Sequence, residues 1–401
     1  MAGYRKRDRP TGAMLENVRT TGRLPTGLLV FGHGSVDIYQ GIVPVLVPFL
    51  VAERQYGYVQ VAGFVLAATL LSSVVQPAFG LLTDRFALPA LVPLAMLAAG
   101  AGVAFVGLHE SYVAALVAVA ISGLGVAAFH PEAARLARSV TGGTHVGMSW
   151  FSLGGNVGFA LAPLVAAPIL AAGGLAATPW LLVPAVLGAV VMLPLLRSGP
   201  VAGKRRSTAG GVDDWPRFRT LSAIIVLRSV LYVGLSTFLS LYVQQRVGPG
   251  HTVSAVALFL LFAGGAVGTI LGGRLATRFG RVRTMRAAYA VAVGAVIGIV
   301  LVPGPALLAF IAVAAIALYV PFSLHITLGQ DYLPNRIGTA SGVTLGLAVS
   351  VGGVFAPALG LLAEQTSLRW MLAALVVLPL GASLLTYRLR EPAPLETAQA
   401  T

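Results

Sequence analysis

Residues 80–86 read Gly-Leu-Leu-Thr-Asp-Arg-Phe, and residues 273–279 read Gly-Arg-Leu-Ala-Thr-Arg-Phe, 193 positions further along the chain. A second pair of similar stretches, Val157-Gly158 to Ala162-Pro163 and Val351-Gly352 to Ala356-Pro357, is 194 positions apart. Each short match is weak evidence alone. Because both pairs share nearly one offset, they predict that the two halves of the chain repeat one arrangement of helices.

The composition of the chain is that of a membrane protein. Of its 401 residues, 57% are hydrophobic and only 10% are Asp, Glu, Lys or Arg. Soluble globular proteins carry roughly 25% charged residues, so this chain cannot cover a water-exposed surface. Its mean hydropathy is +0.87. We therefore expect an all-α membrane protein, and we exclude a soluble enzyme, a nucleic-acid-binding protein and a disordered chain.

Several catalytic and cofactor-binding classes lack their residues in this sequence. The chain has no cysteine, which excludes disulfides, thiol catalysis and cysteine metal sites. It has no Gly-x4-Gly-Lys-Ser/Thr motif and no spacing of His and acidic residues typical of a metal site. We therefore expect no enzyme activity, no cofactor, no metal and no nucleotide, and an ion or solute gradient as the energy source.

Runs of about 20 apolar residues predict twelve membrane-spanning helices. The first six are expected at residues 26–52, 58–82, 89–108, 112–132, 146–171 and 179–197, and the second six at 220–244, 252–275, 284–303, 305–330, 338–363 and 369–388. The expected division of the chain is a basic N-terminal tail (1–25), a six-helix bundle (26–197), a linker (198–219), a second six-helix bundle (220–390) and a C-terminal tail (391–401).

The basic residues predict the orientation of these helices. If the N-terminus is cytoplasmic, 23 of the 27 Lys and Arg residues lie in the tails and cytoplasmic loops, and 3 lie in outer loops. Since positive charge is enriched on the cytoplasmic side, we expect both termini in the cytoplasm and the chain in the cell (inner) membrane. The first apolar run is too long for a signal peptide and contains Asp37, so we expect it to remain uncleaved.

The stretch Gly80-x-Leu82-x-Asp84-Arg85 resembles the signature loop of the major facilitator superfamily of transporters. The match is partial, because Phe86-Ala87-Leu88 replaces the Gly-Arg-Arg/Lys that ends the signature, and the second copy has Thr277 where an acid is expected. In that family the Asp and Arg hold the two halves together in the outward-closed state. The resemblance implies this gating role for Asp84 and Arg85.

Longer stretches resemble the fosmidomycin-resistance group of efflux pumps in that superfamily. They are His33-x3-Asp37-x-Tyr39-x-Gly41-x2-Pro44, Gln76-Pro77-x2-Gly80, Phe129-His130-Pro131-Glu132-Ala133-x-Arg135, Gly154-Gly155-Asn156-x-Gly158 and Gln330-Asp331-Tyr332-Leu333-Pro334-x-Arg336-x-Gly338. These stretches lie in both halves of the chain. The resemblance, and no count of residues, implies a drug exporter driven by exchange for protons.

Asp37 is the first candidate for the coupling chemistry. A charged residue near the bilayer centre costs roughly 2.5–3.5 kcal/mol on insertion scales. Asp37 lies near the middle of the first expected helix, His33 lies one turn earlier on the same face, and Gln40 extends that face as a candidate solute contact. We predict that Asp37 binds the coupling proton with His33 as its partner. The alternative is a static hydrogen-bonded pair that fixes helix packing.

Arg228 is the candidate for solute binding. It lies about nine residues into the seventh expected helix, and Tyr232 follows one turn later. One interpretation is that Arg228, with Tyr232, binds an anionic group such as a carboxylate or a phosphonate. A second is an ion pair with Asp37, because the first and seventh helices line the cavity in the superfamily. A third is a side chain that extends to the cytoplasmic interface.

Four further polar residues complete the set of candidates. Glu132 and Arg135, three positions apart near the end of the fourth helix, predict an interfacial ion pair that acts with the signature loop in gating, with a proton relay as the alternative. Asn156 lies off the face of small residues in the fifth helix, and His325 lies deep in the tenth. We expect Asn156 and His325 to contact the solute.

These residues predict a secondary transporter that exports a small organic or drug-like solute in exchange for protons, by rocking two bundles about a central site. Arg228 favours an anionic solute. The alternative is uptake of a small organic nutrient together with protons by the same fold. We expect the lipid bilayer, protons and the solute as partners, no nucleic acid and no nucleotide, and a monomer.

Overall fold

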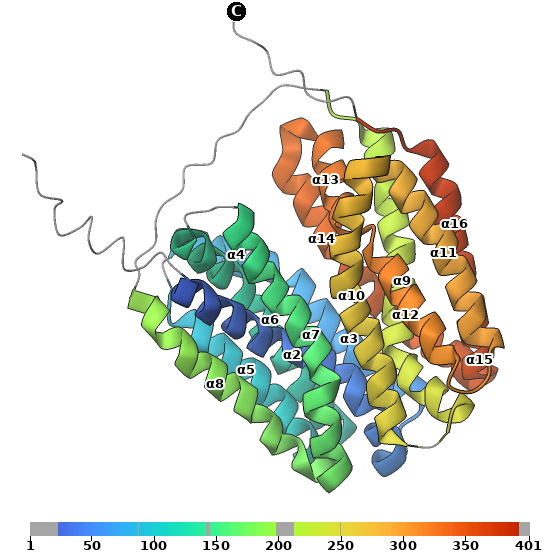
Figure 1. Ribbon diagram of the computed structural model, residues 1–401. Coiled ribbons are helices and arrows are strands. Elements are labelled where there is room, and N and C mark those ends of the chain that lie inside the picture. The colour runs from blue at the N-terminus through green and yellow to red at the C-terminus, as the bar shows by residue number, and fades with distance from the viewer. Residues whose placement is uncertain (1–22, 87, 142–144, 198–211, 249, 393–401) are drawn as a thin grey trace, which may run out of the picture.

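The computed structural model describes residues 23–86, 88–141, 145–197, 212–248 and 250–392, and these residues are almost entirely helical. Figure 1 shows their helices in two groups, one from the residues before 198 and one from the residues after 211. Most of the expected N-terminal tail, residues 198–211 of the linker and residues 393–401 lie outside the described part of the chain.

The first group follows the order of the first six expected helices. It contains α2 (Arg23–Arg54), α3 (Tyr58–Val74), α4 (Gln76–Arg85), α5 (Leu91–Phe105), η1 (Val106–Leu108), α6 (Tyr112–Val140), α7 (His145–Gly173), η2 (Gly174–Leu182), α8 (Val183–Met192) and η3 (Leu193–Arg197).

The second group follows the order of the last six. It contains α9 (Trp215–Arg246), α10 (His251–Phe279), α11 (Arg281–Leu301), α12 (Leu307–Tyr319), α13 (Phe322–Tyr332), η4 (Pro334–Arg336), α14 (Ile337–Gln365), α15 (Leu368–Ala374), α16 (Val377–Leu385) and η5 (Thr386–Arg388). Helix α9 begins before the expected start at residue 220, because Asp214 caps it by accepting a hydrogen bond from the backbone N–H of Arg217 at 3.1 Å.

The described residues contain eleven helical stretches that are long and apolar enough to cross a membrane. The longest, Trp150–Leu196, has 47 residues, about twice what one crossing needs, and it covers both the fifth and the sixth expected helices. The two meet at Gly174, where φ is +58°, a conformation that glycine adopts without strain. The carboxylate of Glu53 holds this turn by accepting a hydrogen bond from the N–H of Leu175 at 3.1 Å.

Proline interrupts two of the expected helices. The second (58–82) is split into α3 and α4 at Val75, just before Pro77, and the tenth (305–330) is split into α12 and α13 at Pro321. Proline has no N–H and cannot continue the ladder of helical hydrogen bonds. The apolar pattern did not predict these breaks because it continues across them.

The same close helix crossing occurs in both groups. Where α2 crosses α7, a Cβ atom added to Gly158 would lie 2.3 Å from the carbonyl oxygen of Gly34. Where α9 crosses α14, a Cβ atom added to Gly352 would lie 2.3 Å from the carbonyl oxygen of Ser229. Gly158 and Gly352 are the glycines that the repeat aligns, and only glycine permits this approach. The predicted all-α fold with two repeated bundles and twelve crossings is therefore confirmed.

The two groups contact each other mainly through α3 with α14 and α7 with α10. At the end where α2 stops and α10 begins, the rings of Phe49 and His251 stack at 4.2 Å, and Oε1 of Glu364 accepts a hydrogen bond from the N–H of Val59 at 3.0 Å. These lower ends lie side by side in Figure 1. Among the described residues, no hydrogen bond or ion pair joins the groups at the opposite end.

Helices α2 and α9, the first of each group, are the most buried of the membrane-crossing segments. In their most apolar windows, 83% of the residues of α2 and 89% of those of α9 are buried. The polar side chains near the middle of these helices, such as Asp37 and Arg228, therefore lie inside the protein and away from lipid.

Candidate functional site

Asp37, His33 and His130 form a buried cluster in the first group. Nε2 of His33 lies 3.2 Å from Oδ2 of Asp37, and Nε2 of His130 lies 3.2 Å from Oδ1. His33 and Asp37 are one turn apart on α2, and His130 comes from α6. The structure therefore brings the predicted pair together and adds a second histidine that the sequence analysis did not place in the site.

Backbone carbonyl groups fix the orientation of both imidazole rings. Nδ1 of His33 lies 2.7 Å from the carbonyl oxygen of Phe151, and Nδ1 of His130 lies 2.8 Å from that of Val126. Because a carbonyl oxygen can only accept, each Nδ1 carries a hydrogen and donates it. Each Nε2 is consequently directed at a carboxylate oxygen of Asp37.

This geometry lets the cluster hold exchangeable protons. With both imidazoles neutral and Asp37 ionised, each Nε2 presents a lone pair to a carboxylate oxygen, and the net charge is −1. One added proton brings the net charge to zero, and a second brings it to +1. Each added proton lies in a hydrogen bond between a histidine Nε2 and a carboxylate oxygen of Asp37. The heavy atoms need little movement for either step.

The cluster is closely packed, but its polar atoms are not all held by aligned hydrogen bonds. Nε2 of His33 and Oδ1 of Asp37 are buried and have no aligned hydrogen-bond partner among the described residues. Helix α7 passes closely because residue 155 is a glycine: a Cβ atom there would lie 2.4 Å from Oδ2 of Asp37. The side chain of His130 is 22% exposed, against 9% for Asp37, so His130 is the member most open to water.

The same three groups offer a donor set that suits a divalent cation. One ligand atom from each of His33, Asp37 and His130 lies within 4.8 Å of the others. Histidines that bind metals commonly donate their other ring N–H to a backbone carbonyl, as both do here. Spacing along the chain does not reveal this set, because His130 lies on another helix, far along the chain from Asp37.

Arg228 is buried on α9 and enclosed by aromatic rings. Its guanidinium carbon lies 5.7, 5.0 and 5.2 Å from the ring centres of Tyr232, Tyr319 and Phe322. Its Nε donates a hydrogen bond to the carbonyl oxygen of Leu318 at 2.6 Å. Leu318 is in the last turn of α12, where carbonyl groups lack helical partners.

The ring contacts of Arg228 stabilise its charge without neutralising it. Aromatic faces attract a cation, but among the described residues no acidic side chain pairs with Arg228. The interpretation of an ion pair with Asp37 is therefore wrong, because Asp37 pairs with the two histidines. The interpretation of extension to the interface is also wrong, because Arg228 is only 2% exposed. An anionic group is the chemistry that this site can accept.

The other candidate solute contacts occupy different surroundings. His325 is buried on α13, and its Nε2 lies 3.0 Å from the hydroxyl oxygen of Tyr289 on α11. Asn156 is half-buried on α7 beside Gly155, and Gln40 is half-buried on α2. Asn156 therefore lies on α7 beside the Asp37 cluster, Gln40 lies on α2 with Asp37, and His325 lies on α13, the helix that also carries Phe322.

The candidate gating residues form contacts within the first group. Nη2 of Arg135 lies 2.5 Å from Oε1 of Glu132, and its Nη1 donates to the carbonyl oxygen of Thr83 at 3.3 Å. This pair therefore joins α6 to α4. Arg85 is exposed at the end of α4, with its guanidinium 5.6 Å from the centre of the Phe86 ring. The side chain of Asp84 lies outside the described part of the structure.

Five residues of these sites were not predicted as site residues, although two of them stand in stretches that carry the family resemblance: His130, Phe151, Gly155, Tyr319 and Phe322. Two local signals pointed to some of them. His130 stands directly before a proline in the Phe-His-Pro-Glu stretch, and Tyr319 and Phe322 lie near Pro321, where α12 ends and α13 begins. Phe151 contributes a backbone carbonyl, which any residue could supply, so no sequence signal existed for it.

Comparison with known proteins agrees with this architecture. The family model of the Major Facilitator Superfamily matches residues 29–357. The fosmidomycin resistance protein of Escherichia coli (strain K12) is 29% identical over 377 residues, which cover 88% of this chain and 90% of that protein. The uncharacterised MFS-type transporter YfnC of Bacillus subtilis (strain 168) is 30% identical over 374 residues, with the same coverage.

Solved structures share the fold. A bacterial homologue of the human lysosomal transporter Spinster, in an inward-facing and occupied conformation, superposes with a TM-score of 0.74 at 17% identity, covering 90% of this chain and 95% of that one. A mutant of the nucleoside transporter NupG superposes with a TM-score of 0.74 at 12% identity, covering 91% and 99%. The chain therefore belongs to the Major Facilitator Superfamily, and it is a multi-pass membrane transporter and not an enzyme.

Proposed function

We propose that this transporter exports a small organic or drug-like solute in exchange for protons, and that Asp37 carries the proton with His33 and His130 as its partners. The observation that carries the proposal is the buried His33–Asp37–His130 cluster in the middle of the most enclosed helix of the first group. Its net charge changes by one or two units as protons are gained or lost.

Coupling follows from the cost of burying charge. A cluster that is negative without protons is stabilised by contact with water, and a neutral one tolerates enclosure. Loss of a proton through half-buried His130 therefore favours the conformation in which the cluster faces an opening. Gain of a proton favours closure of that opening, so the proton state biases the rocking of the two groups.

The solute site is proposed at Arg228. The unneutralised guanidinium and its three rings would bind an anionic group attached to an apolar or aromatic body. His325 and Tyr232 belong to the second group, whereas Asn156 and Gln40 belong to the first, so a solute held between them would contact both groups.

We also propose the orientation and the gates. Both termini are cytoplasmic, the bundles span residues 26–197 and 220–390, and the conformation described is open toward the cytoplasm. The contacts of Phe49 with His251 and of Glu364 with Val59 form the closed outer gate. The inner gate would use Asp84, Arg85 and the Glu132–Arg135 pair when the cytoplasmic ends meet.

The test is transport in everted membrane vesicles, with fosmidomycin as the first solute because of the relative that carries its name. Export by proton exchange predicts accumulation in vesicles with an acidic lumen, and loss of accumulation with a proton uncoupler. Asp37→Asn should abolish gradient-driven accumulation, whereas Glu110→Gln, at an exposed carboxylate, should leave it intact.

Three results would contradict the proposal. Asp37→Asn could transport at full rate against a gradient. Energised right-side-out vesicles could accumulate the solute, which is the behaviour of an uptake symporter. Metal analysis of the purified protein could find one zinc per chain that disappears with His130→Ala, which would make the cluster a metal site.

A further inference from the structure

A cluster of arginines lies where α11 begins and the last described residues of the chain pass beside it. We call Arg283, Arg286, Arg388 and Arg390 the basic rim. Helix α11 packs against α16 and η5, and Figure 1 shows α11 and α16 side by side at the edge of the second group. The rim is therefore at the periphery of the protein, away from the contacts between the two groups.

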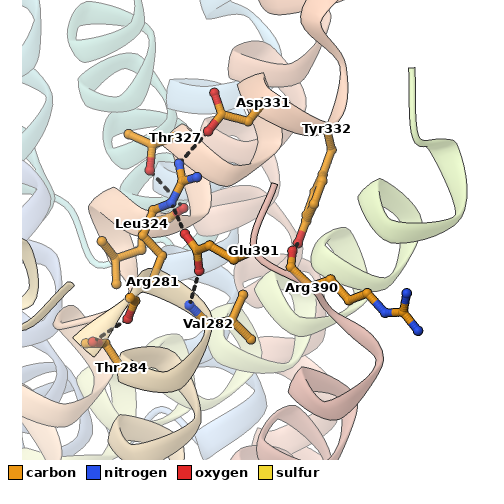
Figure 2. Close-up of polar contacts among 10 residues, drawn as sticks. Arg281, Val282, Thr284, Leu324, Thr327, Asp331, Tyr332, Arg390 and Glu391 are labelled. Carbon is orange, nitrogen blue, oxygen red and sulfur yellow. Dashed lines mark hydrogen bonds and ion pairs between the residues drawn. The ribbon is translucent and has the colours of Figure 1, made fainter. Parts of the chain in front are cut away.

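Arg281 anchors the C-terminal segment at this place but does not belong to the rim. Its Nε donates to Oε1 of Glu391 at 2.7 Å and its Nη1 donates to Oδ2 of Asp331 at 2.6 Å, as Figure 2 shows. Oε2 of Glu391 accepts a hydrogen bond from the N–H of Val282 at 3.1 Å. These acids neutralise Arg281. In Figure 2 the side chain of Arg390 points away from them.

The four rim arginines share the outer side of this segment. Leu389 has an extended backbone and is buried, so its neighbours Arg388 and Arg390 point to the opposite, exposed side. Arg283 and Arg286 are three positions apart and lie on one face of α11. Among the described residues, no acidic side chain pairs with any of the four. The rim therefore carries four positive charges without an acidic partner, and together with Arg281, Asp331 and Glu391 the local net charge is +3 (five arginines and two acids).

The guanidinium of Arg286 has a fixed orientation. Its guanidinium lies 3.8 Å from the centre of the Tyr387 ring, which fixes its plane. Its Nε donates to Oγ1 of Thr386 at 3.3 Å and its Nη2 donates to the carbonyl oxygen of Thr386 at 3.4 Å. No described residue accepts from its Nη1. A planar guanidinium with a fixed orientation and an unused N–H donor on Nη1 can donate a hydrogen bond to a phosphate oxygen.

Apolar side chains continue from the rim toward the bilayer. Tyr387 is exposed on η5, and Leu384 and Leu380, one turn apart, are exposed on α16. The membrane-crossing segments end at Arg281 and Arg388, so the rim lies at the level of the lipid head groups. A ligand that fits this surface has an anionic head and apolar chains.

We infer that the basic rim binds an anionic phospholipid of the adjoining leaflet, with its phosphate on Arg286, Arg388 and Arg390 and its acyl chains along Leu384 and Leu380. The alternative is that these arginines only orient the protein in the membrane through their positive charge. Orientation alone would not require Arg286 to be half-buried and stacked on a tyrosine ring. The inference does not depend on the direction or the coupling of transport.

The test measures phospholipid binding to the full-length purified chain by native mass spectrometry, with phosphatidylglycerol and phosphatidylcholine as the probes. A basic side chain near an anionic head group contributes about fivefold in affinity. The double variant Arg286→Gln/Arg390→Gln should therefore bind phosphatidylglycerol about 25-fold more weakly. The control Arg138→Gln/Arg274→Gln removes the same charge from exposed arginines on α6 and α10 and should change affinity less than about twofold.

Further readouts separate the possible outcomes. Arg388→Gln alone, at an exposed side chain, should lower affinity about fivefold and keeps the test valid if the double variant misfolds. Phosphatidylglycerol, but not inorganic phosphate at equal charge, should raise the melting temperature of the wild-type chain. Equal weakening by the rim and control variants, equal binding of phosphatidylcholine, or stabilisation by inorganic phosphate alone would each overturn the inference.

Discussion

Replacing Gly155 by alanine tests the Asp37 cluster without touching a titratable group. A Cβ atom at this position would lie 2.4 Å from Oδ2 of Asp37 and 2.9 Å from Nε2 of His33, both below the shortest contacts that real Cβ atoms make. The obstructing atoms are ends of side chains and not backbone. The helices can therefore keep their places, while the carboxylate of Asp37 must move.

The structure sets the size of the effect. To reach an ordinary contact distance of 3.4 Å, the carboxylate must retreat by about 1 Å. At an effective dielectric constant of about 20, moving unit charges from 3.2 Å to about 4.2 Å apart costs about 1 kcal/mol. A cluster that holds one proton has one such charge pair, so it loses about 1 kcal/mol, which lowers proton-driven transport roughly fivefold.

The assay compares the initial rate of proton-driven transport in vesicles for wild type, Gly155→Ala and Gly342→Ala. Gly342 is the matched control because an added Cβ atom there meets nothing within 4 Å. The control should transport normally. Gly155→Ala should be slow at neutral pH, partly recover at more acidic pH where proton binding is driven harder, and retain a melting temperature close to that of wild type.

One result would refute this reasoning. If Gly155→Ala transports at the wild-type rate with an unchanged pH dependence, the Asp37 carboxylate does not need its contacts with the histidines for coupling. A rate that falls equally at every pH, together with a lower melting temperature, would indicate a packing defect and not a defect of proton binding.

Three further predictions concern other parts of the molecule. Arg228→Lys keeps the charge but loses the planar stacking and the Nε hydrogen bond, so KM for the solute should rise about tenfold with kcat little changed in transport kinetics. Glu364→Gln weakens a charge-assisted hydrogen bond between the groups and should shift the population toward the outer-open state about tenfold, measured by distances between spin labels introduced into the cysteine-free chain. Gly352→Ala forces a backbone clash between α14 and α9 and should lower the free energy of unfolding by about 1–3 kcal/mol, whereas Gly342→Ala should not, as judged by thermal melting.

The fold could be predicted from the sequence because its causes are local or repeated. Apolar runs of bilayer length predict the crossings wherever they occur, and the repeat at 193–194 positions predicts the equivalence of Gly158 and Gly352. The breaks at Val75 and Pro321 were not predicted from the apolar pattern, since hydropathy averages over them. Proline alone would not have placed them, because Pro163, Pro168 and Pro357 lie inside continuous helices.

The candidate site was predicted only where its members share a helix. His33 and Asp37 are one turn apart, so helical geometry alone brings their side chains together. His130 reaches Asp37 from α6, and no rule of spacing along the chain connects positions on two different helices. Its place in the site is set by how α2 packs against α6 and α7, which is a tertiary property.

The surroundings of Arg228 likewise depend on contacts between helices that the sequence does not show. Burial of a cation in the seventh helix predicted that it needs partners, and three interpretations remained. In the structure, the rings of Tyr319 and Phe322 enclose Arg228. These two residues lie on either side of the break between α12 and α13, in the same group of helices. The aromatic character of these residues was visible in the sequence, but their approach to Arg228 depends on the crossing of α9 with α12 and α13.

Proton release on solute binding tests the central claim most directly. A pH indicator in weakly buffered detergent solution reports protons released when solute is added to the purified chain. If the solute and the proton compete through the cluster, linkage requires wild type to release roughly one proton per bound solute. Asp37→Asn should still bind solute and release none. Undiminished release from Asp37→Asn would contradict the account.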